Sequence, residues 1–251
     1  MQDEIIIDIK DVYKSFGPKE VHMGLTLSIK KGENITVLGG SGSGKSVLLK
    51  EITGLLKPES GDVIVEGENI VPMEETDLVS VRKKMGMLFQ GAALFDSLTV
   101  EENVAYPLRE NTKLPENEIR DMVAKNLELV GLPGIEDKMP SDLSGGMKKR
   151  VGLARAMAIN PRILLYDEPT TGLDPPNISR INQLIRSMQA QFGITAVIIT
   201  HDVKSAFEIS DRIAFLHHGK IIFTGTVDEA EKSDIEVLSD FIHGRLSGAD
   251  E

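Results

Sequence analysis

The sequence predicts an α/β fold with a mostly parallel sheet, an antiparallel β part at the N-terminus and an inserted helical lobe. The runs "RILLYDE" and "TAVIIT" are apolar throughout, as expected for parallel strands covered on both faces. Helical patterns alternate with such strands, which is typical of α/β proteins. In the middle of the chain the strand pattern gives way to helical periodicity.

The N-terminal part is strand-rich. The runs "IIIDI", "LTLSI" and "GDVIVEG" contain many β-branched residues, and "ENITVLGG" is an apolar run that ends in glycines. A helix is expected to start near Gly44 and to run through "KSVLLKEITGLL".

The middle segment "LPENEIRDMVAKNLELVGL" has the spacing of an amphipathic helix. Pro115 suits its start and Gly131 its end. The residues on its apolar stripe are Ile119, Met122, Val123, Leu127 and Val130. We take residues 91–155 as a helical lobe, and residues 1–90 with 156–251 as the core that carries it.

Strands return towards the end of the chain. "RIAFLHHGKIIFTG" predicts two strands joined by a turn near Gly219. The last segment, "DIEVLSDFIHGRL", spaces Ile235, Leu238, Phe241 and Ile242 like an amphipathic helix. Packing on the chain's own core is favoured over a dimer contact.

Composition excludes several classes of function. The 251 residues carry a net charge of -11, which argues against binding nucleic acid or anionic lipid directly. Cysteine is absent, which excludes disulfides and thiolate metal sites. The start "MQDEIIIDIK" does not resemble a secretory signal, and no apolar run approaches the roughly 18 residues of a membrane span. At a membrane, another protein would have to hold this chain.

The segment "GGSGSGKS", Gly39 to Ser46, has the spacing G-x-x-x-x-G-K-[ST] between a strand and a helix. Glycines let successive backbone N–H groups turn towards phosphate oxygens, and the helix start adds partial positive charge. Lys45 is expected at the β- and γ-phosphates, and the Ser46 hydroxyl at Mg²⁺. The segment predicts a nucleoside triphosphate site.

The segment "ILLYDEP" is an apolar strand that ends in two carboxylates. Asp167 is expected in the Mg²⁺ shell, and Glu168 is expected to orient or deprotonate the attacking water. His201 ends "TAVIITH", at the sheet edge where α/β proteins bind ligands, and is assigned to the γ-phosphate. The histidines given a structural role are His22, His217, His218 and His243.

Two further residues give weaker signals. Gln90 closes the apolar run "MGMLFQ", and Phe16 in "YKSFG" could stack on an adenine. Each residue, taken alone, fits a packing role as well.

The segment "LSGGMKKR", residues 143–150, precedes a helical pattern. Ser144, Gly145 and Gly146 would therefore open a helix and offer free N–H groups, a hydroxyl and the positive end of a dipole to an anion. This second anion site lies in a different lobe from the lysine-bearing loop. Two copies arranged head to tail would let each segment close on the other copy's nucleotide.

The basic run in the same segment comprises Lys148, Lys149 and Arg150. We expect it to form a solvated face.

Together these motifs resemble the ATP-binding-cassette ATPases, in the family's order and over almost the whole chain. The resemblance implies a RecA-like P-loop NTPase core, ATP and Mg²⁺ as ligands, and a homodimer that encloses ATP. It assigns nucleotide contacts to Phe16, Gly39, Gly40, Ser41, Gly42, Ser43, Gly44, Lys45, Ser46, Val47, Gln90, Ser144, Gly145, Gly146 and Asp174. It assigns metal contacts to Ser46, Gln90 and Asp167, and catalytic roles to Lys45, Glu168 and His201. The family's usual glutamine at the end of the signature is Met147 here, a side chain that cannot make the polar contact a glutamine would make to nucleotide.

The segment "FQGAALFDSLTVEENVAYPLRE", with "LSGGM" and "TTGLDP", is similar to the ATPases of Mla-type phospholipid transporters. This similarity implies a peripheral place on the cytoplasmic face of a bacterial inner membrane, a separate permease and an Mce-domain lipid-binding protein. The apolar residues expected near the groove for a permease helix are Ala92, Ala93, Leu94 and Phe95, although several would also fit the lobe's core.

Two alternatives are open. Within the family, the cargo could be a lipoprotein or a small solute. Outside transport, the chain could be an ATPase that acts on DNA or ribosomes, or one that regulates a cell-wall enzyme. The single cassette and the negative charge argue against DNA and ribosomes.

Overall fold

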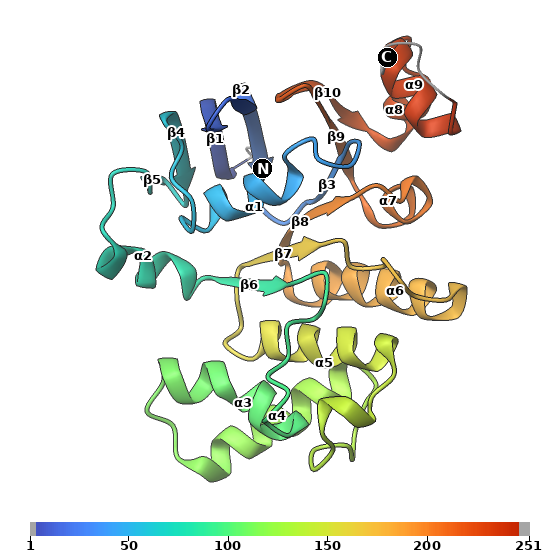
Figure 1. Cartoon of the computed structure of the whole chain (residues 1–251). Helices are drawn as coiled ribbons and strands as arrows, with labels where there is room; N and C mark the ends of the chain where they lie inside the picture. Colours follow the sequence, from blue (N-terminus) through green and yellow to red (C-terminus); the bar gives the residue numbers. More distant parts are fainter. Residues whose placement is uncertain (1–3, 246–251) are drawn as a thin grey trace.

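The computed structural model describes residues 4–245. Figure 1 shows a β-rich upper part and a helical lower part. The elements in chain order are β1 (Ile5–Phe16), β2 (Lys19–Lys30), β3 (Asn34–Leu38), α1 (Lys45–Ile52), β4 (Ser60–Val65), β5 (Glu68–Asn69), α2 (Glu75–Arg82), β6 (Met85–Leu88), α3 (Val100–Asn111), α4 (Glu116–Leu129), η1 (Pro140–Asp142), α5 (Gly145–Met157), β7 (Ile163–Asp167), α6 (Pro175–Phe192), β8 (Thr195–Thr200), α7 (Val203–Ile209), β9 (Arg212–His217), β10 (Lys220–Thr226), α8 (Val227–Glu231) and α9 (Glu236–His243). Residues 1–3, used above against a secretory signal, and Leu246 of the last predicted helical segment lie outside the described residues.

The larger sheet has six strands in the order β10-β9-β3-β8-β7-β6. Strands β6, β7, β8, β3 and β9 run parallel, and β10 pairs antiparallel with β9. Every residue of β3 and β8 is buried, because helices or the second sheet cover both faces. The predicted mostly parallel sheet is confirmed, and so is the turn near Gly219 between its last two strands.

The smaller sheet is antiparallel, with the strand order β2-β1-β4-β5. Its buried residues form one cluster with the inner face of α1 and with the facing side of the larger sheet. Helix α1 ends at Ile52, earlier than the sequence indicated. Gly54 takes a left-handed φ of 66°, and the Leu56 N–H turns back to the Lys50 carbonyl at 3.0 Å, which stops the helix.

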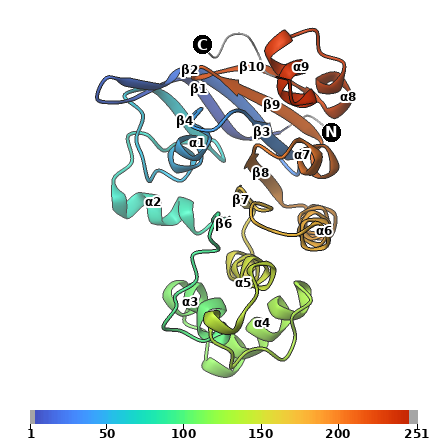
Figure 2. The same ribbon diagram turned by 45° about the vertical axis from the view of Figure 1, so that its right-hand side comes forward.

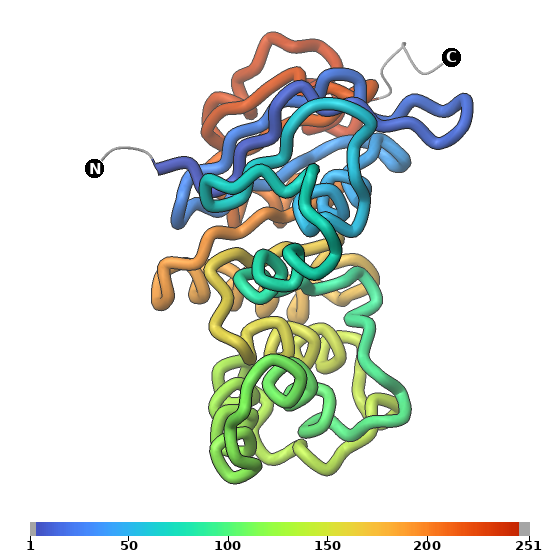
Figure 3. Tube along the Cα trace, turned by 90° about the vertical axis from the view of Figure 1, so that its left-hand side faces the viewer, coloured from blue at the N-terminus to red at the C-terminus, as the bar shows by residue number. Residues whose placement is uncertain are grey.

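Helices α3, α4 and α5 follow one another between β6 and β7 and form the helical lobe, drawn in green to yellow in Figure 3. Helix α4 begins directly after Pro115 and is followed by Gly131 with a φ of 68°, as predicted. Helix α3 starts with a capping box between Thr99 and Glu102.

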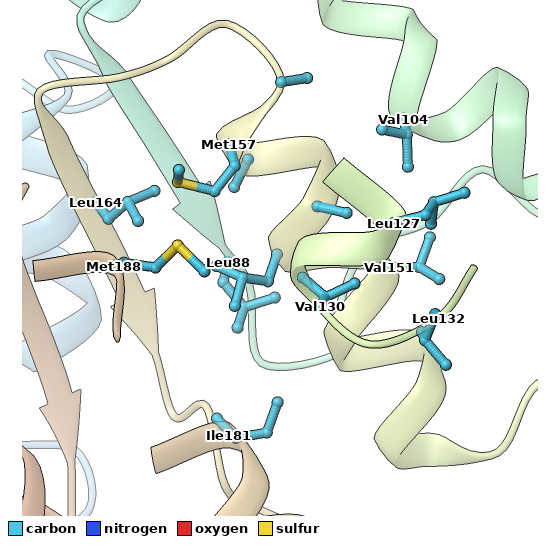
Figure 4. Packing of buried hydrophobic residues seen from close by; sticks show 14 of the residues in the cluster. Leu88, Val104, Leu127, Val130, Leu132, Val151, Met157, Leu164, Ile181 and Met188 are labelled. Carbon is cyan, nitrogen blue, oxygen red and sulfur yellow. The ribbon is translucent and has the colours of Figure 1, made fainter. Parts of the chain in front are cut away.

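One hydrophobic cluster runs from the lobe into the core without a break. Figure 4 shows Val104, Leu127 and Val151 of the lobe in the same packed region as Leu164 of β7 and Met188 of α6. Figure 2 shows α5 directly below β7 and α6, with α3 and α4 beyond it. The division of the chain at residues 91 and 155 therefore stays a prediction, since buried contacts cross it.

The C-terminal helix α9 packs on its own chain. Leu238 is fully buried in a cluster with Phe215 of β9, and the Phe215 and Phe241 rings lie 5.2 Å apart between centroids. This is the packing role that the sequence favoured.

Among residues 4–245, no helix has both the length and the apolar character needed to cross a membrane.

Gly86 of β6 should tolerate no larger side chain. A Cβ added there would lie 2.3 Å from the Ala156 carbonyl oxygen of α5 and 2.7 Å from Leu164 Cδ2. We expect Gly86→Ala to lower the free energy of unfolding by about 1–3 kcal/mol, because the backbone of α5 must shift. Urea denaturation followed by circular dichroism would measure this loss.

Gly91→Ala is the matched control, because a Cβ there meets nothing within 4 Å. Its free energy of unfolding should change by less than about 0.5 kcal/mol. Equal stability of both variants would contradict the close approach of β6 and α5.

Candidate nucleotide site

The candidate site lies where three parallel strands end. The carboxyl ends of β3, β7 and β8 meet at one edge of the larger sheet, because these strands pair in parallel and in register. A cavity of about 660 Å³ opens at this edge. Its lining residues are Phe16, Lys19, Val21, Gly40, Ser41, Gly42, Gly44, Lys45, Ser46, Val47, Gln90, Asp167, Glu168, His201 and Phe241. The volume suits a ligand of nucleotide size.

The phosphate loop, residues 39–46, links β3 to α1. Gly42 and Gly44 take left-handed φ values of 76° and 107°, which favour glycine. A Cβ on Gly39 would lie 2.5 Å from the Leu216 carbonyl oxygen. No side chain of the described residues caps the start of α1, so its first N–H groups are available to an anion.

Lys45 folds over this loop. Its Nζ donates to the carbonyl oxygens of Gly39 at 2.7 Å and Gly40 at 2.9 Å. Burial lowers the pKa of Lys45, and the charges of Glu168 and Asp167 partly oppose that shift. The ammonium thus stands at the centre of the loop with anionic groups beside it.

A buried pair supports the loop from below, which the sequence did not reveal. His22 Nδ1 lies 2.9 Å from Glu51 Oε2, and His22 Nε2 lies 3.2 Å from the Gly44 carbonyl oxygen. Both side chains are fully buried. His22 is structural, as expected, but it has an acidic partner on α1. The available signal was Glu51 itself, which occupies an inward position between Leu48 and Ile52.

Asp167 ends β7 beside the loop. Its Oδ1 accepts a hydrogen bond from Ser46 Oγ at 3.4 Å. Burial raises the pKa of Asp167 and the neighbouring Glu168 charge raises it further, while Ser46 and the lysines Lys149 and Lys50 oppose the shift. A hydroxyl and a carboxylate side by side are hard oxygen ligands of the kind that Mg²⁺ uses together with phosphate oxygens, so these residues fit that ion.

Glu168 follows Asp167 and is held from several sides. Its Oε1 lies 2.9 Å from His201 Nδ1. Its Oε2 accepts hydrogen bonds from Thr200 Oγ1 at 2.9 Å and from Thr171 Oγ1 at 3.0 Å. His201 is 60% exposed at the cavity, whereas Glu168 is 12% exposed. The pair joins the ends of β7 and β8.

Phe16 and Gln90 complete the cavity at two sides. Phe16 ends β1 with 47% of its surface exposed, and the Lys14 ammonium lies 5.4 Å from its ring centroid. Gln90 follows β6 and is also exposed. Both residues line the cavity, and their contacts to nucleotide stay a prediction.

The signature segment, residues 143–147, lies outside this cavity. Ser144 caps α5 and accepts a hydrogen bond from the Met147 N–H at 3.3 Å. Asp174 precedes α6 and accepts a hydrogen bond from Asn177. Ser144, Gly145, Gly146 and Asp174 are absent from the cavity's lining among the described residues. One chain therefore does not bring its two predicted anion sites together.

The prediction that the basic run forms a solvated face is wrong for Lys149. Only 4% of Lys149 is exposed, and its Nζ donates to the Glu168 carbonyl oxygen at 2.9 Å. The side of α5 that carries Lys149 faces the end of β7, so this lysine cannot reach solvent. Arg150 is half-buried and donates to the carbonyl oxygens of Val130 and Gly131.

Curated relatives match almost the whole chain. A "Probable ribonucleotide transport ATP-binding protein mkl" from Mycobacterium leprae is 43% identical over 97% of this chain and 70% of its own length. The "Intermembrane phospholipid transport system ATP-binding protein MlaF" of Haemophilus influenzae is 40% identical over 97% of this chain and 92% of its own. The corresponding MlaF of Escherichia coli is 37% identical over 97% and 90%.

Solved structures agree with these relatives. A dimeric ATP-binding cassette in a post-hydrolysis state, bound to ADP and Pi, superposes with a TM-score of 0.82 at 33% identity, covering 88% of this chain and 98% of that one. The cbiO1 protein of Clostridium perfringens gives a TM-score of 0.84 at 32% identity, covering 94% of both chains. Residues 22–171 match the family model described as ABC transporter. The chain belongs to the ABC transporter ATPase family.

Proposed function

We propose that this chain is the ATP-hydrolysing subunit of a transporter that moves phospholipid between bacterial membranes through a separate permease. One observation carries the proposal of a working dimer. The phosphate loop and the two carboxylates share one cavity, while the helix start at Ser144 lies outside its lining. A second copy placed head to tail would bring its own Ser144 and Gly146 to the open side of that cavity.

Each residue has a part in hydrolysis. The loop N–H groups and Lys45 would hold the β- and γ-phosphates, and His201 would contact the γ-phosphate. Glu168 would orient a water towards the γ-phosphorus and accept its proton as the bond to ADP breaks. Mg²⁺, held by Ser46 and Asp167 with Gln90 nearby, would neutralise charge on the phosphate oxygens. Phe16 would stack on the adenine.

The dimer would complete each site from both chains. Ser144, Gly145 and Gly146 would donate to the γ-phosphate bound by the partner, and Asp174 would lie at the seam. The dimeric cassette with ADP and Pi supports this arrangement, because it superposes on most of this chain. Met147 contributes its N–H to the cap of Ser144, so the loss of glutamine at this position leaves the helix start intact.

A permease would dock on an apolar groove in the lobe. The groove has a volume of about 320 Å³ and includes Phe89, Phe95 and Tyr106, which are 38%, 43% and 43% exposed. Arg155 also lines it and donates to the Ala92 and Ala93 carbonyl oxygens at 2.8 Å. Of the four apolar residues after Gln90, Ala92 is buried and Leu94 packs on the core, so Ala93 and Phe95 are left to face a partner. An amphipathic permease helix suits such a groove.

The phospholipid cargo rests on the MlaF relatives, whose names state intermembrane phospholipid transport. An Mce-domain protein would then belong to the complex, and the chain would lie on the cytoplasmic face of the inner membrane. The mycobacterial relative, named for ribonucleotide transport, favours a second candidate, a transporter of small solutes. Cargo selection would reside in the permease, because the site described here serves ATP.

Glu168→Gln tests the catalytic assignment. The amide keeps the shape of the side chain but cannot accept the proton of the attacking water, so phosphate release should fall at least about 100-fold. The variant should accumulate as an ATP-bound dimer, seen by size exclusion with light scattering. Glu110→Gln, at an exposed position of α3, is the control and should keep full activity. Normal turnover of Glu168→Gln would refute the assignment.

Asp167→Asn separates stability from catalysis. Because the pKa of Asp167 is raised in the folded chain, its ionised form disfavours folding, and that cost grows as pH rises through the folded pKa. Without nucleotide and Mg²⁺, the variant should melt above the wild type at pH 7.5. Hydrolysis should nevertheless fall at least about 100-fold, because a metal ligand is lost.

The melting temperatures of the two proteins should converge as the pH falls through the raised pKa of folded Asp167 towards its ordinary value, because protonation removes the same charge from wild-type Asp167. Differential scanning fluorimetry over this range would measure the difference. A gap that widens at low pH would contradict the raised pKa.

Purification of a tagged chain from solubilised membranes tests the partners. A permease, an Mce-domain protein and bound phospholipid should co-purify. Phe95→Asp should lose the permease, because a charge enters the groove, while Phe192→Asp at an exposed position of α6 should retain it. A permease with a soluble binding protein would favour small solutes, and the absence of any membrane partner would refute transport.

A further inference from the structure

Lys149 on α5 is a buried cation placed against the catalytic end of β7. Its Nζ donates to the main-chain carbonyl oxygen of Glu168 at 2.9 Å, and only 4% of the residue is exposed. Lysine is rarely buried to this extent without a specific partner. Helix α5 belongs to the helical lobe, whereas Glu168 belongs to the edge of the sheet.

The backbone that Lys149 holds is in an unusual conformation. Glu168 has a φ of 48°, in the left-handed region that non-glycine residues adopt at a cost. Its N–H donates to the Ile199 carbonyl oxygen at 2.9 Å, so β8 holds the peptide group before the Glu168 Cα and Lys149 holds the peptide group after it. This conformation aims the Glu168 carboxylate at His201 and the cavity.

The charge of Lys149 also lies among the site's carboxylates. Burial lowers the pKa of Lys149, and the charges of Asp167 and Glu168 raise it in part. A buried apolar side chain would avoid this desolvation, so packing alone does not explain a lysine here. The hydrogen bond to the Glu168 carbonyl oxygen explains a lysine at this position better.

We propose that Lys149 is a positioning residue for Glu168, which fixes the peptide of the catalytic carboxylate from the signature helix. The proposal rests on the proposed role of Glu168 in hydrolysis. Lys149 lies five positions after Ser144 on the same rigid helix. The end of α5 that would meet the partner's nucleotide is therefore joined to the Glu168 of its own chain.

Lys149→Met removes the donor and the charge while keeping an unbranched side chain of similar length. We expect kcat for ATP hydrolysis to fall about tenfold, with KM for ATP changed less than twofold, because the phosphate loop and Phe16 are untouched. The melting temperature is measured alongside, because loss of the buried charge favours folding whereas loss of the donor to the Glu168 carbonyl opposes it. Lys148→Met, at the adjacent and more exposed position, should leave kcat unchanged.

A double-mutant cycle with Glu168→Gln distinguishes positioning from other roles. If Lys149 acts through Glu168, Glu168→Gln with Lys149→Met should be no slower than Glu168→Gln alone. The proposal would be overturned if the fold losses in kcat of the two single variants multiply in the double variant. A wild-type kcat for Lys149→Met would overturn it as well. A lower melting temperature with unchanged kcat would assign Lys149 to stability only.

Lys149→Arg provides a second variant that keeps a donor and a charge. It should recover at least part of the kcat that Lys149→Met loses. If the Met variant fails to fold, Lys149→Arg replaces it in the double-mutant cycle with Glu168→Gln. An Arg variant as slow as the Met variant would overturn the proposal. Normal turnover of Glu168→Gln alone would instead refute the proposed role of Glu168, whatever the Lys149 variants show.

Discussion

The candidate site depends on the parallel pairing of β3, β8 and β7. Parallel strands in register end at the same edge, so the phosphate loop after β3, the carboxylates after β7 and His201 after β8 converge without any of these segments being close in the chain. Antiparallel pairing would send alternate ends to opposite edges. The helical crossovers that parallel strands require also explain why both faces of β3 and β8 are buried and their sequences apolar throughout.

At this edge, charged groups are held where water is scarce, and the structure offsets their cost with specific partners. Lys45 donates to loop carbonyls and feels the charges of Glu168 and Asp167, and His22 lies between Glu51 and the carbonyl of Gly44. A Cβ on Gly44 would lie 2.8 Å from His22 Nε2, so this pair and the loop's glycine require each other. These buried charged groups lower the stability of the chain without nucleotide, and they stand where phosphate oxygens would bind. Such a conflict between stability and function is general in proteins.

Local signals in the sequence predicted most of the fold and the residues around the cavity. The phosphate loop, the β7 carboxylates and the start of α5 at Ser144 are encoded within a few residues each, so spacing identifies them. His22 with Glu51 and Lys149 with Glu168 escaped prediction, because their partners lie 29 and 19 positions away and only the folded chain brings them together. The short α1 was missed for a local reason, since the left-handed Gly54 overrides an apolar pattern that continues to Leu56.

Helix α5 connects the regions on which the proposed function depends. Its Arg155 donates to the carbonyl oxygens of Ala92 and Ala93 at the groove, and its Lys149 donates to the carbonyl oxygen of Glu168. Its first residues follow the Ser144 cap and are those that the proposed function assigns to the partner's nucleotide. Its apolar side is packed in the cluster shared by the lobe and the core, which ties the helix to both. Under the proposed function, a displacement of α5 by a permease in the groove would shift Lys149 and Ser144 as well. Coupling between permease and ATP would then require no separate hinge, because one helix carries residues at all three places.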